Sequence, residues 1–145
     1  MEKIIKLNTF NEILEVLEVF SDSLNSLSAG RTVRENFAKK FLDNGIVLAL
    51  KNSDEIVGFI AFYSNDSVKK ISYISMIAVS PEHKRKGYGT KLIEAAVKSS
   101  REKNMKYIRL EVNKNNINAI SFYKYFGFIF LSEQTENTCY MELEL

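Results

Sequence analysis

The chain has 145 residues, enough for one domain whose core buries about two-thirds of the surface of the unfolded chain. Its 20 lysine and arginine residues nearly balance 18 aspartate and glutamate residues, and a net charge of +2 argues against a nucleic-acid-binding protein. No apolar run reaches the roughly 18 positions of a membrane span, and the N-terminus lacks a signal-peptide pattern. We therefore expect a single cytoplasmic domain over residues 1–145, without nucleic-acid or membrane partners.

Cysteine and histidine each occur once, as Cys139 and His83. One cysteine excludes an internal disulfide, and one residue of each kind leaves too few ligands for a Cys/His zinc site. We expect no bound metal and assign no catalytic role to either residue.

The first 45 residues have the pattern of one strand and two helices. The expected elements are a strand over 3–7, a helix over 10–20 and a second, short helix over 32–44. Asn8 or Thr9 can cap the first helix. The sequence Thr-Val-Arg-Glu from Thr32 fits a capping box, and Gly45 is a stop signal for the second helix.

The middle of the chain carries β-rich runs and one long amphipathic helix. We expect strands over 46–50, 56–63 and 71–79, a helix over 87–103 and a strand over 107–113. Short polar gaps between the first three strands predict an antiparallel meander that opens with a hairpin. A helix between two strands makes a crossover, so the strands before and after it should be parallel.

An aromatic helix and a hairpin are predicted for the C-terminal part. The helix covers 119–126 with Gly127 as its αL cap, and two strands over 128–131 and 138–145 flank a polar loop. The predicted order is β-α-α-β-β-β-α-β-α-β-β, a mixed α/β fold.

A basic, glycine-containing loop precedes the long helix. Gly87 and Gly89 lack Cβ atoms, so the backbone there can turn tightly and approach a ligand closely. The first turn of the helix offers unpaired N–H groups that attract anions. Lys84, Arg85 and Lys86 add positive charge just before it. The loop therefore predicts a binding site for a diphosphate or a similar polyanion.

Two motifs together resemble those of the GNAT family of N-acetyltransferases. Residues 84–89 resemble the family's Arg/Gln-x-x-Gly-x-Gly/Ala acetyl-coenzyme A loop, with Lys84 where Arg or Gln is usual. Residues 110–128 resemble its second signature, Leu-Glu-Val, Asn-x-x-Ala-Ile, Tyr and Gly-Phe. The element order also resembles that of the family. The resemblance implies a central mixed, mostly antiparallel sheet of about seven strands flanked by about four helices.

The resemblance also implies acetyl-coenzyme A as co-substrate. Its diphosphate would lie on the loop amides, and its pantetheine arm would pair with the backbone of Ile77 and Val79. The Ile77 N–H would donate to the thioester carbonyl. The expected cofactor-binding residues are Ile77, Ala78, Val79, Lys84, Arg85, Lys86, Gly87, Tyr88, Gly89, Thr90 and Asn116.

The acceptor amine must lose a proton before it attacks, because an amine with a pKa near 10.4 is protonated at neutral pH. Similar enzymes that acetylate ribosomal-protein N-termini use a glutamate and a tyrosine that correspond here to Glu111 as base and Tyr123 as acid. Another arrangement would use Tyr73, with Ser75, to hold a water that acts as the base. The structural alternatives are a solvated Glu111 paired with Arg109 or a neighbouring lysine, and a Tyr123 that only packs in the core.

Several classes of amine acceptor are compatible with the sequence. We expect a small-molecule amine, such as an amino sugar, amino acid or polyamine, because the chain is minimal. A protein N-terminus or lysine, or a non-catalytic module that binds coenzyme A, are the alternatives. A dinucleotide-binding domain is set aside because Leu92 stands where a third glycine belongs. We expect a monomer or a homodimer.

Overall fold

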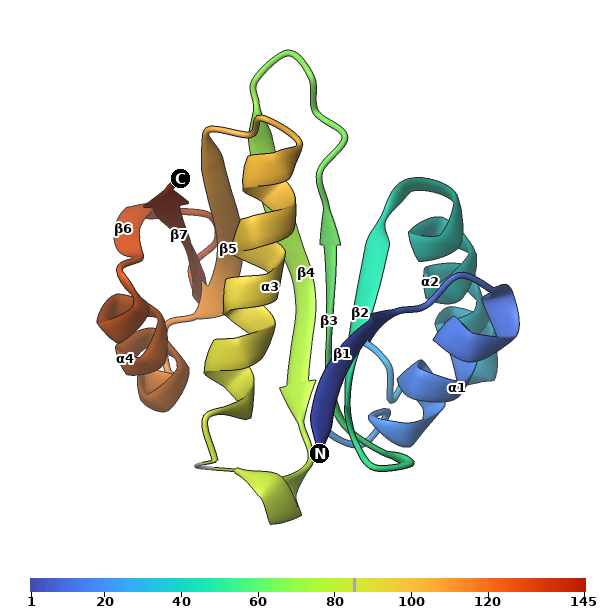
Figure 1. The fold of residues 1–145 in the computed structure, drawn as a ribbon. Helices are drawn as coiled ribbons and strands as arrows, with labels where there is room; N and C mark the ends of the chain where they lie inside the picture. Colours follow the sequence, from blue (N-terminus) through green and yellow to red (C-terminus); the bar gives the residue numbers. More distant parts are fainter. Residues whose placement is uncertain (85) are drawn as a thin grey trace.

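The computed structural model describes residues 1–84 and 86–145 as one seven-stranded sheet with helices on both faces (Figure 1). The strand order is β1-β2-β3-β4-β5-β7-β6. The elements are β1 (Glu2–Lys6), α1 (Phe10–Val19), α2 (Arg31–Asn44), β2 (Ile46–Asn52), β3 (Glu55–Tyr63), β4 (Ile71–Val79), a 3₁₀ helix (Pro81–His83), α3 (Tyr88–Glu102), β5 (Tyr107–Asn113), α4 (Ile117–Phe126), β6 (Ile129–Glu133) and β7 (Thr138–Glu144).

The strand pairing confirms the predicted topology. β1 to β4 form an antiparallel meander, and the β5–β7 and β7–β6 pairs are also antiparallel. Only β4 and β5 are parallel, as the crossover through α3 requires. The mixed, mostly antiparallel sheet is therefore confirmed. Within the described residues, no helix is both long and apolar enough to cross a membrane.

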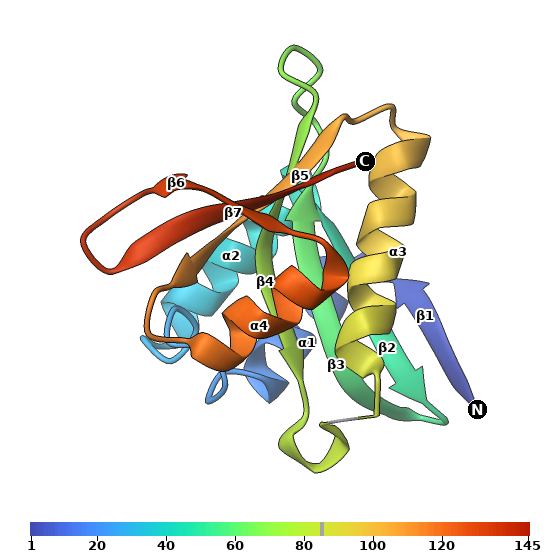
Figure 2. The same ribbon diagram turned by 90° about the vertical axis from the view of Figure 1, so that its left-hand side faces the viewer.

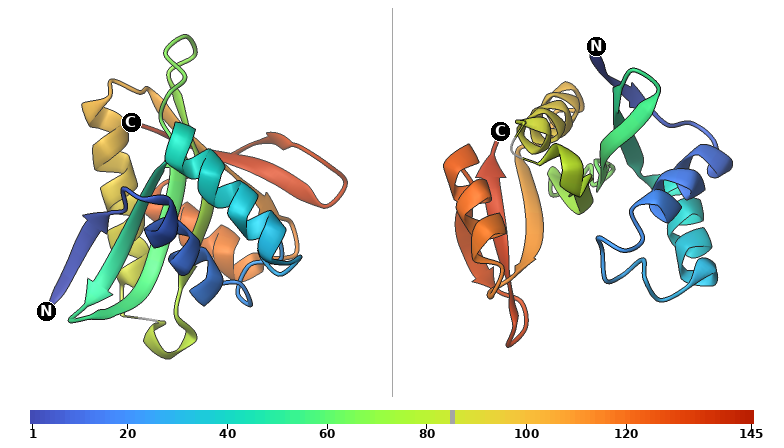
Figure 3. Two further views of the ribbon diagram at one scale, coloured as in Figure 1. Left: turned by 90° about the vertical axis from the view of Figure 1, so that its right-hand side faces the viewer. Right: turned by 90° about the horizontal axis from the view of Figure 1, so that it is seen from below.

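Each face of the sheet has its own hydrophobic core. Helices α3 and α4 cover one face, and α1 and α2 cover the other (Figures 2 and 3). Leu92 and Ile93 of α3 are fully buried against the first face, and Leu17 and Phe41 are buried against the second. Burying each such side chain contributes about 1.5–3 kcal/mol. These two cores hold the central strands rigidly, so the strand ends can carry a site.

A β-bulge in β4 reverses the direction of its side chains. The register with β3 passes from Phe62↔Ile74 to Ala61↔Met76, which leaves Ser75 without a partner. One extra residue exchanges the two faces of a strand. Ile74 accordingly belongs to the α3/α4 core and Met76 to the α1/α2 core. After the bulge, it is the side chain of Ile77 that packs on the α3/α4 side.

The start of α2 differs from the prediction. The helix has 14 residues, begins at Arg31 and follows Gly30, which has a φ of 129° and makes no side-chain cap. The predicted capping box at Thr32 is wrong, and the helix is one residue longer than the predicted range 32–44. Near this end the Arg34 guanidinium donates to the Leu27 carbonyl at 3.0 Å, a bond between the helix and the segment before it. Local capping signals cannot report such a contact.

The start of α1 and the end of α2 agree with the prediction. Thr9 and Glu12 form a complete capping box at α1, which decides between the two predicted caps in favour of Thr9. Gly45 closes α2, and its N–H donates to the Phe41 carbonyl at 2.8 Å. Both capping signals involve residues within about one helical turn, so they can be read from the sequence alone.

Candidate active site

β4 and β5 pair over only part of their length. The register runs from Ile71↔Tyr107 to Ile74↔Leu110, and β5 continues to pair with β7 along all seven residues. Beyond the bulge at Ser75, β4 follows β3 and no further pairing with β5 occurs in the described chain. The two parallel strands therefore diverge at their C-terminal ends (Figure 1).

A cavity of about 580 Å³ lies where the strands diverge, between the start of α3 and the start of α4. It brings together both sequence motifs. Lys86 is exposed and is not part of its wall, and Arg85 lies outside the described residues. The lining residues are Ile77, Ala78, Val79, His83, Lys84, Gly87, Tyr88, Gly89, Thr90, Asn116, Asn118, Ala119, Phe122 and Tyr123.

The first turn of α3 presents backbone amides to this cavity. Gly87 is the N-cap and has a φ of 78°, a left-handed conformation that favours glycine. The N–H of Lys91 donates to the Gly87 carbonyl at 3.1 Å, so the amides of residues 88–90 precede the first bond within the helix. These amides and the helix dipole create a partial positive charge that suits a diphosphate.

Gly89 and Tyr88, both in the glycine-containing loop, have structural roles that the sequence does not reveal. A Cβ built on Gly89 would lie 3.4 Å from Cζ of Phe122, so α3 and α4 approach each other closely at this point. Tyr88 is buried in the α3/α4 core, and the nearby Glu2 carboxylate raises the pKa of its phenol. We therefore assign the Tyr88 amide, and not its phenol, to the candidate site.

Tyr123 belongs to both the core and the cavity wall. It is 9% exposed, and its ring lies 5.4 Å from the ring of Phe122 and 5.6 Å from that of Phe128. Burial raises the pKa of Tyr123 to about 12, so the phenol keeps its proton at neutral pH. Among the described hydrogen bonds none involves this phenol. Its proton is therefore available to a bound molecule.

Glu111 lies on the other face of the sheet. Its neighbours Leu110 and Val112 point into the α3/α4 core, so alternation places Glu111 on the opposite side, where it is exposed. It is not a lining residue of the cavity. The suggested pair with Arg109 is wrong, because Arg109 donates to Glu142 at 2.8 and 2.9 Å.

Tyr73 lies near Glu111. Burial, followed by the charge of Glu111 and the nearby Tyr140, raises the pKa of Tyr73 to about 12. A phenol with that pKa does not accept protons at neutral pH, but it can hold a water by donating to it or accepting from it. Ser75, the second residue of the predicted water site, is the bulge residue of β4.

Asn116, which the sequence predicted as a cofactor-binding residue, lines the cavity and also caps a helix. Its Oδ1 accepts from the Ala119 N–H at 3.2 Å and so caps α4. It thereby fixes the start of the helix that carries Tyr123. The cap and the cavity wall are compatible, since the first turn of α4 faces α3.

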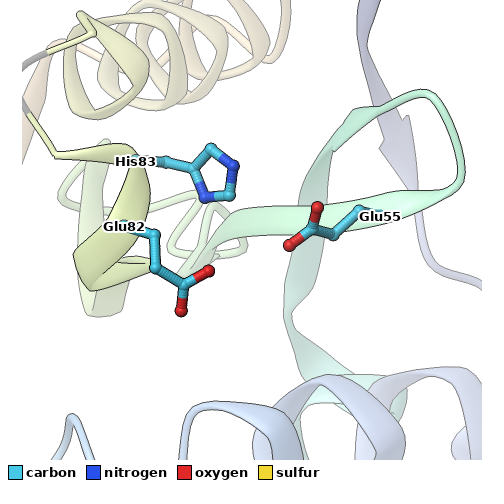
Figure 4. Close-up of side chains that lie close together, drawn as sticks. All are labelled: Glu55, Glu82 and His83. Carbon is cyan, nitrogen blue, oxygen red and sulfur yellow. The ribbon is translucent and has the colours of Figure 1, made fainter.

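His83 is the residue that sequence reasoning missed. It lines the cavity, and its Nδ1 is buried without a hydrogen-bond partner. One candidate ligand atom of His83 and one each of Glu55 and Glu82 lie within 4.8 Å of one another. Figure 4 shows the three side chains close together. These atom types can ligate a metal, so the expected absence of a metal stays a prediction. The sequence could show only the adjacent pair, because Glu55 comes from a distant strand.

The chain belongs to the Acetyltransferase (GNAT) family, whose family model matches residues 13–128. The Bacillus subtilis protein YxbD, itself uncharacterized, is 36% identical over 80 residues, which are 54% of this chain and 46% of that protein. The aligned part of the chain thus spans less than half the length of YxbD. An uncharacterized N-acetyltransferase from Archaeoglobus fulgidus is 28% identical over 123 residues, 78% of this chain and 84% of that protein.

Solved structures share the fold over the whole chain. A ribosomal-protein alanine N-acetyltransferase from Escherichia coli superposes with a TM-score of 0.79 at 21% identity, covering 99% of this chain and 94% of that one. PaiA N-acetyltransferase from Thermoplasma acidophilum, in complex with coenzyme A, gives 0.77 at 18% identity and covers 100% and 99%. At these identities the likeness establishes the fold, which is that of the GNAT family.

Proposed function

We propose that this protein is an N-acetyltransferase that moves an acetyl group from acetyl-coenzyme A to a primary amine. The observation that carries the proposal is the 580 Å³ cavity, which joins the free amides at the start of α3 to the Tyr123 phenol beside the divergent strands. Acetyl-coenzyme A has an anionic diphosphate that suits the α3 amides and an extended pantetheine arm that would carry the thioester to Tyr123. Family membership and a fold neighbour that binds coenzyme A support the assignment.

The chain's own residues would hold the co-substrate at two places. The amides of residues 88–90, with Lys84 at the edge, would bind the diphosphate. The backbone of β4 at Ile77 and Val79 would bind the pantetheine arm, because β5 no longer pairs with β4 there. A free strand edge offers N–H and C=O groups to an extended ligand. The Ile77 N–H is the candidate donor to the thioester carbonyl.

The reaction requires that protons and bonds balance. The acceptor ammonium first gives a proton to the base, and the amine nitrogen then forms a bond to the acetyl carbon. The carbon–sulfur bond breaks, the amide nitrogen loses its second proton to solvent, and Tyr123 gives its phenol proton to the leaving sulfur. Solvent returns a proton to Tyr123. The base then releases its proton to solvent, so one proton is released overall. General acid catalysis of this kind contributes roughly 10²- to 10⁴-fold.

Glu111 is our candidate for the base. It lies on the sheet face opposite α3 and α4, so the amine would approach from that face and reach the thioester through the gap between β4 and β5. The alternative base is a water held by Tyr73 and Ser75. Because Tyr73 lies near Glu111, both arrangements place the base on the same side.

The acceptor we propose is a small-molecule amine of the amino sugar, amino acid or polyamine type. A protein N-terminus is the second candidate, supported by the fold neighbour that acetylates a ribosomal protein. The presence of both Glu111 and Tyr123 favours an enzyme over a non-catalytic binding module, since a pure binder needs neither.

Two measurements on the purified protein test this function. Acetyl-coenzyme A should raise the melting temperature, because a ligand that binds only the folded state stabilises it by mass action. Thiol release should then be measured over a panel of small amines and short peptides with free N-termini. Binding without release to any amine would favour the non-catalytic module, and no thermal shift at millimolar acetyl-coenzyme A would contradict the proposal.

A further inference from the structure

We propose that Thr138 and Thr135 position the Glu111 carboxylate through a chain of hydroxyl hydrogen bonds with a fixed direction. The inference rests on the proposed function, in which Glu111 accepts the amine proton. It assigns a positioning role to Thr138 at the start of β7 and to Thr135 in the loop before it, which no motif singled out. The observation behind it is the Thr138 Oγ1 to Glu111 Oε2 distance of 2.6 Å.

The sheet register places these two side chains on one face. Glu111 pairs with Tyr140, and Asn113 pairs with Thr138, in the antiparallel ladder of β5 and β7. Side chains at 138 and 140 point the same way because a strand alternates with a period of two. Thr138 is therefore the diagonal neighbour of Glu111, within reach of a long side chain.

Thr135 fixes the direction of the chain of hydrogen bonds. Its Oγ1 accepts from the N–H of Asn137 at 3.1 Å and from the N–H of Thr138 at 3.0 Å. A hydroxyl has two acceptor lone pairs and one proton, so both lone pairs of Thr135 are occupied. Its proton must then point to Thr138 Oγ1, which lies 2.8 Å away. Thr138 Oγ1 accepts this hydrogen bond from Thr135 and donates its own hydroxyl proton to Glu111.

The arrangement leaves one carboxylate oxygen of Glu111 committed and the other free. Oε2 is held by Thr138, and Arg109 forms its ion pair with Glu142, so the Arg109 guanidinium does not compete at Oε1. Glu111 is exposed, and an exposed glutamate without a partner samples several rotamers. The threonine chain thus holds the carboxylate in one orientation while keeping one oxygen open for the amine or a bridging water.

Steady-state kinetics test the positioning role. Thr138→Val keeps the shape and the strand propensity of the side chain and removes the hydroxyl. Because a hydrogen bond to a charged group contributes more than a neutral one, we expect kcat to fall roughly tenfold with an unchanged KM for acetyl-coenzyme A. Thr138→Ser, which keeps the hydroxyl, should retain most of kcat. Thr32→Val, the same change at an exposed helix position, serves as the matched control.

A double variant separates positioning from general damage. In a Glu111→Gln background, Thr138→Val should cause no further loss of kcat, because the two residues act through one carboxylate. An equal tenfold loss in both backgrounds, or wild-type kcat in Thr138→Val, would overturn the proposal.

An NMR measurement decides the proposal without any turnover. Three-bond couplings report whether the Glu111 χ1 angle occupies one rotamer. We expect one rotamer in the wild type and in Thr138→Ser, and averaging in Thr138→Val. Equal averaging in all three proteins would overturn the positioning role. If the wild type acetylates no amine, the proposed function fails, and these couplings alone show whether Thr138 orders Glu111.

Discussion

Tyr123 shows how one side chain can serve both packing and chemistry. Its ring packs between Phe122 and Phe128, while its phenol is free of the described hydrogen bonds and reaches the cavity. The burial that fixes the ring also raises the pKa of the phenol to about 12. That makes it a weaker acid than an ordinary tyrosine toward a thiolate whose conjugate acid has a pKa near 8.5 in water.

Tyr123→Phe removes the phenol proton and keeps the ring. We expect normal folding and normal acetyl-coenzyme A affinity, with turnover lower by roughly 10- to 1000-fold. Single-turnover thiol release with an identified amine acceptor measures the effect. Tyr125→Phe is the matched control, because Tyr125 is 92% exposed on the same helix. Wild-type turnover in Tyr123→Phe, with chemistry rate-limiting, would show that water supplies the proton.

The base can be identified by comparing two variants. Glu111→Gln keeps the hydrogen bond from Thr138 and removes the basic carboxylate, so turnover at neutral pH should fall by at least 10-fold with cofactor affinity unchanged if Glu111 is the base. Tyr73→Phe should then have little effect. The opposite pattern in the two pH–rate profiles would assign the base to a water held by Tyr73.

At the scale of the elements, the site depends on where β4 leaves β5 and where α3 meets α4. The bulge at Ser75 turns the next residues of β4 over, and the missing pairing beyond Ile74 frees the strand edge. Helix α4 then closes the other side, with Phe122 opposite Gly89. The cavity therefore exists because two elements diverge while a third covers the gap.

Gly89→Ile tests this close approach. The added Cβ alone would make ordinary contact with Phe122 at 3.4 Å, but the branched atoms beyond it would enter the cavity beside the first helical amides. We expect acetyl-coenzyme A affinity to fall by more than 10-fold, because the backbone can no longer approach the diphosphate. Isothermal titration calorimetry measures the affinity, and circular dichroism verifies the fold. Gly89→Ala should bind much better than Gly89→Ile, and equal wild-type affinity in both would contradict the loop assignment.

The whole molecule consists of one sheet between two cores, and a site at the split in that sheet. β1 to β4 belong mainly to the half covered by α1 and α2, and β5 to β7 to the half beside α4 (Figure 3). The parallel β4–β5 pairing at residues 71–74 and 107–110 joins the halves. Tyr123 belongs to the α3/α4 core, which also contains Ile74 and Leu110 from the junction, so its burial contributes to the stability of the whole sheet.

Alkaline unfolding measures that dependence. The folded pKa of Tyr123, about 12, lies above the ordinary value near 10, so its contribution to stability is complete below pH 10 and is lost as the pH rises toward 12. Between pH 8 and pH 11 the wild type should lose roughly 1 kcal/mol more unfolding free energy than Tyr123→Phe. Urea unfolding at both pH values gives the difference. Tyr125→Phe should behave like the wild type, and identical pH dependence in all three proteins would show that Tyr123 titrates normally.

The sequence by itself determined the element order, the parallel crossover and the two motifs that meet at the cavity. These features depend on periodicity, turn residues and chain connectivity, which act over a few neighbouring positions. Local context therefore predicted Gly45 as the end of α2 and limited the cap of α1 to Asn8 or Thr9, of which Thr9 is the cap.

Only the tertiary structure decided which side chains face the site. In the structure α2 begins at Arg31, and His83 lies in the cavity wall. Arg109 pairs with Glu142 and not with Glu111. The tertiary structure also brings Thr138 to Glu111 across the sheet. Each of these outcomes depends on strand register, on one bulge or on contacts between elements distant in sequence. A single-residue shift in a strand reverses every side chain, and no local pattern encodes that choice.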